Sequence, residues 1–431
     1  MRAGLIGLWA TAIAVASPAR ALDIATLQLH AQGGSVAAER DLGLAYRRGQ
    51  VGPVNAEAAR LWLRKAADQG DTEAEYQLSE MYFGEYGITP DRAQALEWLT
   101  RAANAGNGKA EAQLYSLYRA RAGEPGAASK AGALWPAVER DLVKAANSGD
   151  PDAQVMMCQI VEIRGNDIGP DGQKPVFESV DACRDWAEKA RVTYLQRAQD
   201  GDEEAAAIAG ANMEIMGVGG PANANGRALI KQAADAGVVR AMNVMAMFGL
   251  SSAQGHDPSD AIAYLHRAAD AQSVSALVRF ASMYLGGEDV DKDVPQSVAL
   301  YRRAAEAGSS GAQLMLGMLY SDHGGEHLVT VDMDKALKWY GLAARQGDVT
   351  AQLHLSILYY EGRQIPQDKV RAYAWQLITN DFVAARNTTA VLTLVGMRSD
   401  YARIQNLEND LTPDEKALAE AMARDLRGQL E

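Results

Sequence analysis

Small and hydrophobic residues recur along this chain at the spacing of an α-helical face. Each of nine alanines lies four residues after a boundary position; an apolar residue such as Leu78 usually follows four residues later, and a tyrosine such as Tyr82 often follows after four more. Residues at offsets of four and eight lie on one face of a helix. We therefore expect a helix, called helix A, after each boundary. The alanines are Ala38, Ala74, Ala110, Ala153, Ala205, Ala241, Ala276, Ala312 and Ala351.

A second helix, called helix B, is expected before each boundary. It ends in a pair of small residues such as Ala66-Ala67, and it often carries an aromatic residue such as Trp98 eight residues before the boundary. The boundary residue is a glycine in all units but the sixth. Glycine supplies the left-handed residue that ends a helix at little steric cost. Because the boundary that ends the sixth helix B is Gln272, we expect that helix to end with a different geometry.

Successive boundaries are 36, 36, 43, 52, 36, 35, 36 and 39 residues apart, a period typical of two-helix repeats. Segments such as MDKALKWYGLAARQGDVTAQLHLSILYYEG from Met333 and DRAQALEWLTRAANAGNGKAEAQLYSLY from Asp91 resemble the Sel1-like repeat family, a relative of the tetratricopeptide repeats. The resemblance covers residues 35–380 and implies an all-α fold, an α/α superhelical solenoid of about nine repeats. It also implies a protein-interaction scaffold without shared catalytic residues. The tyrosine position departs from the pattern at Val161, Met213 and Gly249.

The solenoid is expected to form one continuous domain, because each unit of a solenoid contacts only its neighbours and length is reached by stacking. Residues 22–34 are predicted to form an N-terminal capping helix, residues 35–380 the repeats, and residues 381–431 a C-terminal helical cap. The last helix should begin with a capping box, formed by Thr412 and Glu415 around Pro413.

The first 21 residues resemble a secretory signal peptide. Arg2 precedes an apolar run from Ala3 to Ala16, and a proline break leads to the small-x-small pattern of Ala19 to Ala21. The apolar run is short for a membrane span, and no cysteine follows it as in a bacterial lipoprotein. An uncleaved anchor and a chance apolar terminus are the alternatives. We expect cleavage after Ala21 and a periplasmic or secreted protein.

The charge of the chain restricts its partners. The formal net charge is −13, and loss of Arg2 and Arg20 with the signal peptide takes it to −15. No basic stretch interrupts this acidic background, so neither nucleic acid nor insertion into a membrane after cleavage is expected. A content of 48% apolar but only 6% aromatic residues suits closely packed, alanine-rich helices.

The two cysteines lie in the fourth unit. Cys158 is on helix A and Cys183 is near the start of helix B, and the two positions differ by only about 3 Å along an antiparallel helix pair. In an oxidising compartment this arrangement favours a disulfide between Cys158 and Cys183 over two separate thiols. Two cysteines without paired histidines do not predict a metal site.

The third and fourth units owe their extra length to Gly/Pro-rich insertions, residues 120–132 and 164–178. Insertions on one face of a repeat array can mark the binding surface, or they can be tolerated loop length. The nearby methionines, at helical spacing, favour core positions over an adaptable binding surface. They are Met156, Met157, Met213, Met216, Met242, Met245 and Met247.

Two motif matches do not lead to a predicted metal or catalytic site. His323, Glu326 and His327 fit the H-x-x-E-H zinc-peptidase pattern, but two glycines lie between the first histidine and the glutamate, in a segment expected to be a loop. The acidic turn from Asp289 to Asp293 lacks the glycine and the glutamate of a calcium loop. We predict no catalytic residue, no metal and no cofactor.

The main hypothesis is a non-catalytic exported scaffold that binds a protein or peptide through its concave face and its inserted loops. By family resemblance, it could regulate envelope signalling or exopolysaccharide production. The scaffold hypothesis predicts a long acidic or apolar groove without a deep pocket. The alternative is a polysaccharide-handling accessory protein or secreted virulence factor, which Trp135 and Trp186 would favour if they lined the groove. A cryptic enzyme is the third hypothesis, and it would need clustered carboxylates or histidines in one concavity.

Overall fold

The computed structural model describes residues 24–120, 126–164, 180–215, 221–251, 258–321, 328–386 and 407–428, and within these ranges the regular structure is helical. The elements are α1 (Ile24–Gln32), α2 (Val36–Arg47), α3 (Ala56–Asp68), α4 (Thr72–Glu80), the π-helix η1 (Met81–Glu85), α5 (Arg92–Asn104), α6 (Gly108–Ala120), α7 (Ala127–Asn147), α8 (Pro151–Arg164), α9 (Val180–Gln199), α10 (Glu203–Ile215), α11 (Pro221–Asp235), α12 (Val239–Ser251), α13 (Ser259–Asp270), α14 (Val274–Gly286), α15 (Val294–Glu306), α16 (Ser310–Tyr320), α17 (Met333–Arg345), α18 (Val349–Glu361), α19 (Lys369–Arg386), the 3-10 helix η2 (Leu407–Asp410) and α22 (Pro413–Gly428).

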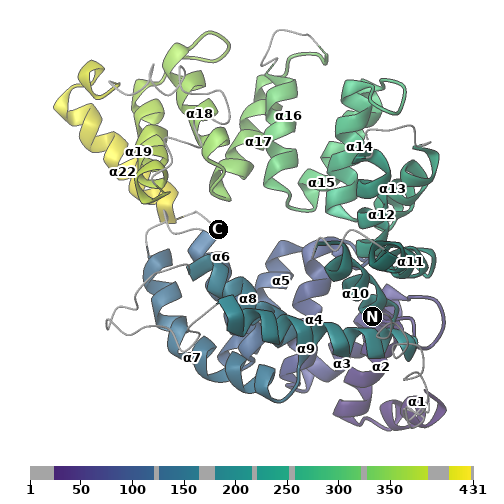
Figure 1. The fold of residues 1–431 in the computed structure, drawn as a ribbon. Helices are drawn as coiled ribbons and strands as arrows, with labels where there is room; N and C mark the ends of the chain where they lie inside the picture. The colour runs from purple at the N-terminus through teal and green to yellow at the C-terminus, as the bar shows by residue number, and fades with distance from the viewer. Residues whose placement is uncertain are drawn as a thin grey trace, which may run out of the picture.

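The helices form the predicted all-α solenoid. Even-numbered helices from α2 to α18 are helix A of each unit, and the helices that follow them, α3 to α19, are helix B. Each helix A packs against its own helix B and against the preceding helix B. In Figure 1 the chain winds from α1 to α9, returns through α10 and α11 to the region of α2, and continues from α12 to α22 as an open arc. None of the helices in the described ranges has both the length and the hydropathy needed to cross a membrane.

Local residues at the repeat boundaries fix the start and end of the helices. Asp71 and Asp348 each accept a hydrogen bond of 2.9 Å from the backbone N–H three residues later, as N-caps do. Gly70 and Gly347 end the preceding helices with φ angles of 88° and 81°. At the C-terminal end the predicted capping box is confirmed, because the Thr412 N–H donates to Glu415 at 2.8 Å and the Glu415 N–H donates to Thr412 at 3.3 Å.

Gln272 adopts the same turn as the boundary glycines, so the expectation of a different geometry was wrong. Its φ angle is 61°, its N–H donates to Ala269 O at 3.0 Å, and the Ser273 N–H donates to Ala268 O at 3.0 Å. The glycine-containing turn at Gly347 makes the same pair of bonds. The packing of the two adjoining helices therefore sets this backbone conformation, and the glutamine accepts a strain that glycine avoids.

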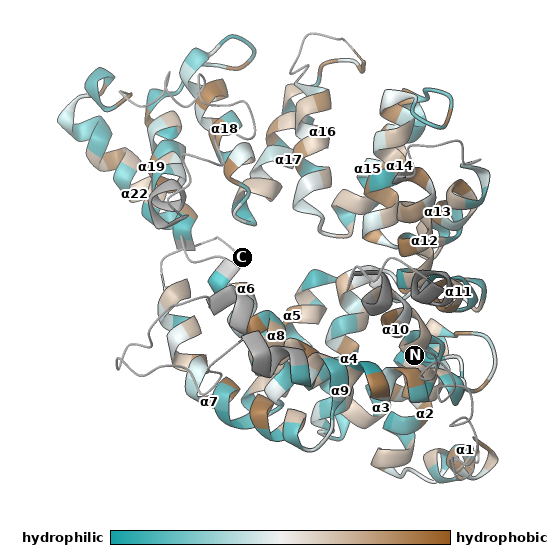
Figure 2. Cartoon of the chain, in the orientation of Figure 1, coloured by the Kyte–Doolittle hydropathy of each residue, from teal (hydrophilic) through white to brown (hydrophobic). Residues whose placement is uncertain are grey.

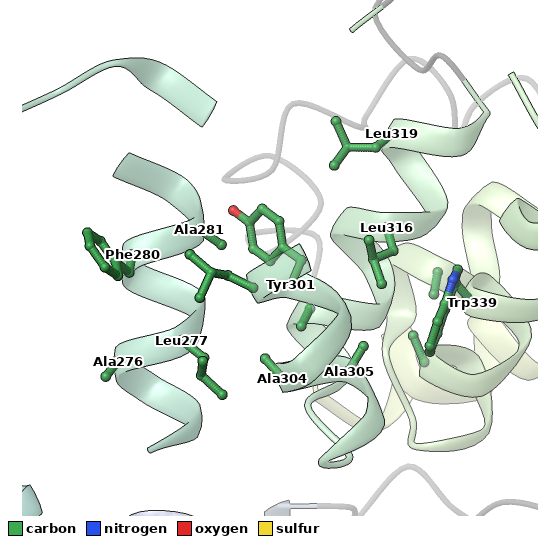
Figure 3. Packing of buried hydrophobic residues seen from close by; sticks show 14 of the residues in the cluster. Ala276, Leu277, Phe280, Ala281, Tyr301, Ala304, Ala305, Leu316, Leu319 and Trp339 are labelled. Atoms are coloured by element: carbon green, nitrogen blue, oxygen red, sulfur yellow. The ribbon is translucent and has the colours of Figure 1, made fainter. Parts of the chain in front are cut away.

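The small-residue columns lie where helix A and helix B approach each other. A Cβ atom added to Gly317 of α16 would lie 2.6 Å from the ring of Tyr340 in α17, and one added to Gly43 would lie 2.7 Å from Leu63. Figure 3 shows Tyr301 of α15 between Leu277 of α14 and Leu316 of α16. Large residues fill the space beside small ones, and no room remains for a further methyl group.

The solenoid also contacts itself from one superhelical turn to the next, so the expectation that units contact only their neighbours was wrong. The Glu203 N–H of the fifth unit donates to Arg48 O of the first unit at 2.9 Å. Gly84 of the second unit lies so close to Val274 of the seventh that an added Cβ would be 3.0 Å from its side chain. The superhelix completes a turn in about four units. Its first two units therefore lie against the fifth to seventh.

Candidate functional site

The concave face of the superhelix is lined mainly by the helices A, and it has two parts that differ in the residues lining them. The first part is a polar cavity of about 550 Å³, enclosed by α2, α4, α6, α8, α9, α10 and the start of α12. The second is an apolar groove of about 1280 Å³ that runs across α12, α14 and α16. The groove agrees with the scaffold hypothesis, whereas the enclosed cavity differs from its prediction of no deep pocket. The cavity arises because the first turn closes on itself.

A buried ion pair joins the two turns in the wall of the cavity. Arg47 of α2 lies 2.8 Å from the carboxylate of Glu204 on α10, and the two side chains are 7% and 8% exposed. Arg47 also donates to Gln77, and its guanidinium lies 4.9 Å from the ring centre of Tyr86. Burial acts to lower the pKa of the Arg47 guanidinium, but the combined effect of Glu204 and the neighbouring Tyr86, Asp152 and Glu80 raises it above its usual value.

A second group of charges surrounds Asp202, which is 1% exposed and precedes α10. Its carboxylate lies 2.7 Å from Arg197 and 3.5 Å from Arg48, and it caps α10 by accepting from the Ala205 N–H at 2.9 Å. These contacts join the fourth and fifth units to the first. Asp202 therefore serves as a structural link and helix cap.

A third group of buried charges extends along the helices A. Lys109 of α6 lies 2.8 Å from Glu73 of α4 and 3.0 Å from Asp150 at the start of α8. Burial would lower the pKa of Lys109, but the two carboxylates raise it above its usual value. Burial would raise the pKa of Asp152, but the charge of Lys109 and a hydrogen bond of 2.5 Å from the Tyr194 hydroxyl hold it below its usual value.

The groove presents apolar side chains from three successive helices A. Val244 and Met247 come from α12, Val278 from α14, and Leu314 and Met315 from α16. Met247 is 43% exposed, which is more than expected for a methionine that fills a hydrophobic core. Figure 2 shows hydrophobic residues along α12 and α16, in contrast to the largely hydrophilic α22.

Two arginines lie among these apolar residues. Arg240, at the start of α12, lines both the groove and the polar cavity, and Arg279 lies in the middle of α14. Glu288 and Asp289 line the groove just beyond the C-terminal end of α14. The two edges of the groove therefore differ in charge.

The tryptophans expected in a polysaccharide-binding groove lie elsewhere. Trp135 packs at 5.2 Å from the ring of Tyr115, and Trp186 packs on the core formed by α7 and α8. Neither residue lines the cavity or the groove. The methionines divide between the two interpretations, because Met157 and Met242 are buried in the core while Met247 faces the groove.

The remaining candidate residues lie partly outside the described ranges. Cys158 is on α8 and Cys183 is on α9, two helices in contact, but the side chain of Cys183 is outside the described residues. The disulfide therefore stays a prediction. The inserted segment 165–174 and the motif from His323 to His327 are also outside the described residues. Asp293 caps α15 by accepting from the Gln296 N–H at 2.9 Å.

The residues that line the cavity and the groove occupy recurring positions relative to the repeat alanines. The sequence pattern did not identify these positions as a binding surface. Relative to each repeat alanine, residues at offsets −1, +3 and +6 face the concave side, as Glu204, Gln77 and Glu80 do in the cavity. In the sixth and eighth units the offsets +3 and +6 hold residues such as Val244 and Met247. The signal available in the sequence was a change from polar to apolar residues at offsets +3 and +6 in the sixth and eighth units. The seventh unit keeps the polar residues Arg279 and Ser282 at these offsets.

Comparison with known proteins identifies the repeat. The family model described as Sel1 repeat matches residues 36–71, 72–107, 239–273, 274–309, 310–348 and 349–375. Among curated proteins, DAP3-binding cell death enhancer 1 of Rattus norvegicus is 37% identical over 76 residues, which span 18% of this chain and 14% of that protein. The similarity thus covers a small part of the rat protein.

Solved structures with Sel1-type folds also resemble the chain. One is c5321, a protective antigen present in uropathogenic Escherichia coli strains, with 23% identity, coverage of 95% of both chains and a TM-score of 0.33. Another is a Sel1 repeat protein from Oxalobacter formigenes, with 23% identity, coverage of 77% of this chain and 90% of that one, and a TM-score of 0.36.

Proposed function

Because the chain belongs to the Sel1 repeat family, whose members are in general protein-interaction scaffolds, we propose that it binds another protein or a peptide through the groove across α12, α14 and α16. The observation that supports this proposal is the partial exposure of apolar side chains on three successive helices A. Exposed apolar surface with polar neighbours is typical of protein interaction sites. The role is non-catalytic in this proposal, as is typical of the family.

The proposal places the protein in the periplasm or outside the cell, after removal of residues 1–21. There the Cys158–Cys183 disulfide would hold the fourth unit together. The two insertions, residues 120–132 and 164–178, would be second contact regions. Regulation of envelope signalling or exopolysaccharide production is the proposed setting. No observation favours the polysaccharide-handling alternative, because the two tryptophans that would support it lie outside the groove.

The test is a comparison of three baits in a pull-down from envelope extract, with proteins identified by mass spectrometry. The baits are the chain from residue 22 onward, its Met247→Asp variant, and its Leu418→Asp variant. Met247 and Leu418 are both exposed apolar residues, 43% and 56% respectively, but only Met247 lies in the groove. A buried charge in an apolar contact is costly, so we expect Met247→Asp to reduce recovery of a specific partner at least about tenfold.

Leu418→Asp should leave recovery unchanged, since α22 is remote from the groove residues. Equal recovery of every captured protein by the original bait and the Met247→Asp bait would overturn the groove as the binding surface. A fourth bait without residues 165–174 reports separately on the inserted segment.

A further inference from the structure

Arg240 is the residue at which the polar cavity meets the apolar groove. It is in the position immediately before the repeat alanine Ala241, as Glu204 of the cavity and Ser275 of the groove are before theirs. Its side chain is exposed and contributes to the lining of both spaces. A partner segment that follows the groove toward the first turn of the superhelix therefore reaches Arg240.

Arg240 is held in place by an aromatic residue. Its Nη2 donates a hydrogen bond of 3.0 Å to the hydroxyl of Tyr86, and its guanidinium carbon lies 5.4 Å from the centre of that ring. Tyr86 comes from the second unit and Arg240 from the sixth, so the contact exists only because the superhelix closes. These two contacts restrain the Arg240 side chain, which reduces the entropy lost on binding.

Within the described part of the chain, the guanidinium of Arg240 makes no ion pair within 4 Å. Tyr86 and, after it, the carboxylates of Glu204 and Glu80 nevertheless raise its pKa against the effect of burial. The other two arginines of the cavity do make ion pairs, since Arg47 pairs with Glu204 and Arg197 pairs with Asp202. Of the five N–H donors of Arg240, the structure shows a hydrogen-bond partner for one, which donates to the Tyr86 hydroxyl. A planar guanidinium with free donors recognises a carboxylate through two parallel hydrogen bonds.

The charge distribution of the groove gives the bound segment a direction. Helices A are stacked with the same polarity, so their N-terminal ends, including Arg240, form one edge of the groove. Glu288 and Asp289 lie at the opposite edge, beyond the C-terminal end of α14. A carboxylate on the partner is attracted to the Arg240 edge and repelled from the other.

Resting on the proposed function, we infer that the partner presents a segment with apolar side chains for the groove and a carboxylate that pairs with Arg240. The carboxylate is either an acidic side chain or a free chain terminus. The surrounding protein is acidic overall, so this recognition is local. It depends on Arg240 at the edge of the groove, while Arg279 in the middle of α14 is a second cation of the same groove.

The experiment is a selection of random twelve-residue peptides on the immobilised chain from residue 22 onward. Parallel selections use the Arg240→Glu, Arg424→Glu and Met247→Asp variants, each checked for the original helix content and melting temperature. Arg424 is an exposed arginine on α22, so its variant matches the charge change without touching the groove. An Arg240→Gln variant serves if Arg240→Glu fails the folding check.

We expect the original chain and Arg424→Glu to enrich peptides that combine leucine, methionine or phenylalanine with aspartate or glutamate. Arg240→Glu should keep the apolar enrichment and replace acidic by basic residues. For a synthetic peptide from the selection, loss of its carboxylate or the Arg240→Gln substitution should weaken binding about tenfold. Amidation of the peptide terminus and conversion of its side-chain acids to amides, tested separately, identify which carboxylate is used.

This experiment distinguishes failure of the groove as the binding surface from failure of Arg240 as the carboxylate-binding residue. Acidic enrichment that persists unchanged with Arg240→Glu, or with Arg240→Gln, overturns the role of Arg240 and leaves the groove as the binding surface. Absence of apolar enrichment with the original chain, or the same peptides with Met247→Asp, overturns the groove itself and with it the inference.

Discussion

At the scale of single residues, position 272 shows that a repeat pattern can predict a turn even where one unit lacks the usual residue. A glycine column identifies a left-handed turn, and Gln272 adopts that turn with a φ of 61° although the column favours glycine. The repeat pattern therefore located the turn. The packing of the adjoining helices maintains the geometry of the turn at position 272, where glutamine replaces the usual glycine.

Glu111 is the residue from which we expect a pH-dependent stability. It is 3% exposed, its Oε2 has no hydrogen-bond partner within the described residues, and burial together with the nearby Asp141 raises its pKa to about 7. The corresponding position in three other helices A is a glutamine whose amide donates to a backbone carbonyl of the preceding helix B. These glutamines are Gln154, Gln313 and Gln352.

We expect Glu111→Gln to stabilise the protein by about 1–2 kcal/mol at pH 8 and to have little effect at pH 5. The folded state holds the proton more tightly than the unfolded state, so stability falls as pH rises from the usual glutamate pKa through about 7. Urea unfolding of both proteins at the two pH values measures the difference. An equal effect of the substitution at both values would contradict the raised pKa.

At the scale of elements, the sequence predicted helix A, helix B and their close contact, because the small residues that permit the contact recur in fixed columns. It did not predict the ion pairs by which Lys109 of α6 links α4 and α8. Lys109 lies one position before a repeat alanine, as Glu73 and Asp152 do, and alternating charges at this offset come together when the helices A stack.

We expect Lys109→Met to reduce the free energy of unfolding by about 2 kcal/mol, because it leaves two half-buried carboxylates without their cation. The matched control is Lys231→Met, which removes an exposed lysine paired with Asp235 on the same helix and should cost less than about 0.5 kcal/mol. Chemical denaturation of both variants gives the comparison. Similar losses for the two would show that the buried charges add no more than an exposed pair.

At the scale of the whole molecule, the two halves of the superhelix differ in their inner surface. One continuous hydrophobic core runs from Ala198 to Ala423 in the described residues, whereas the first turn contains several smaller cores around a polar cavity. The ion pair between Arg47 and Glu204 links the first unit to the fifth at the point where the turn closes.

We expect Glu204→Lys to open this turn, because it places a third positive charge beside Arg47 and Arg48. Small-angle X-ray scattering should show a larger radius of gyration at unchanged helix content by circular dichroism. Glu57→Lys, at a glutamate 63% exposed on α3, is the control and should leave the radius unchanged. An unchanged radius for Glu204→Lys would show that backbone contacts such as Glu203 to Arg48 hold the turn without the ion pair.

The sequence by itself determined the repeat, its two helices, their caps and the small residues at their contact, since each depends on residues close together in one or two adjacent units. The closure of the superhelix, the cavity, and the contact of Tyr86 with Arg240 were decided by the tertiary structure. They depend on small rotations between units that accumulate over about four repeats, and no single repeat encodes their sum. The side chains one position before the repeat alanines form a shared surface only when that superhelical turn brings them together.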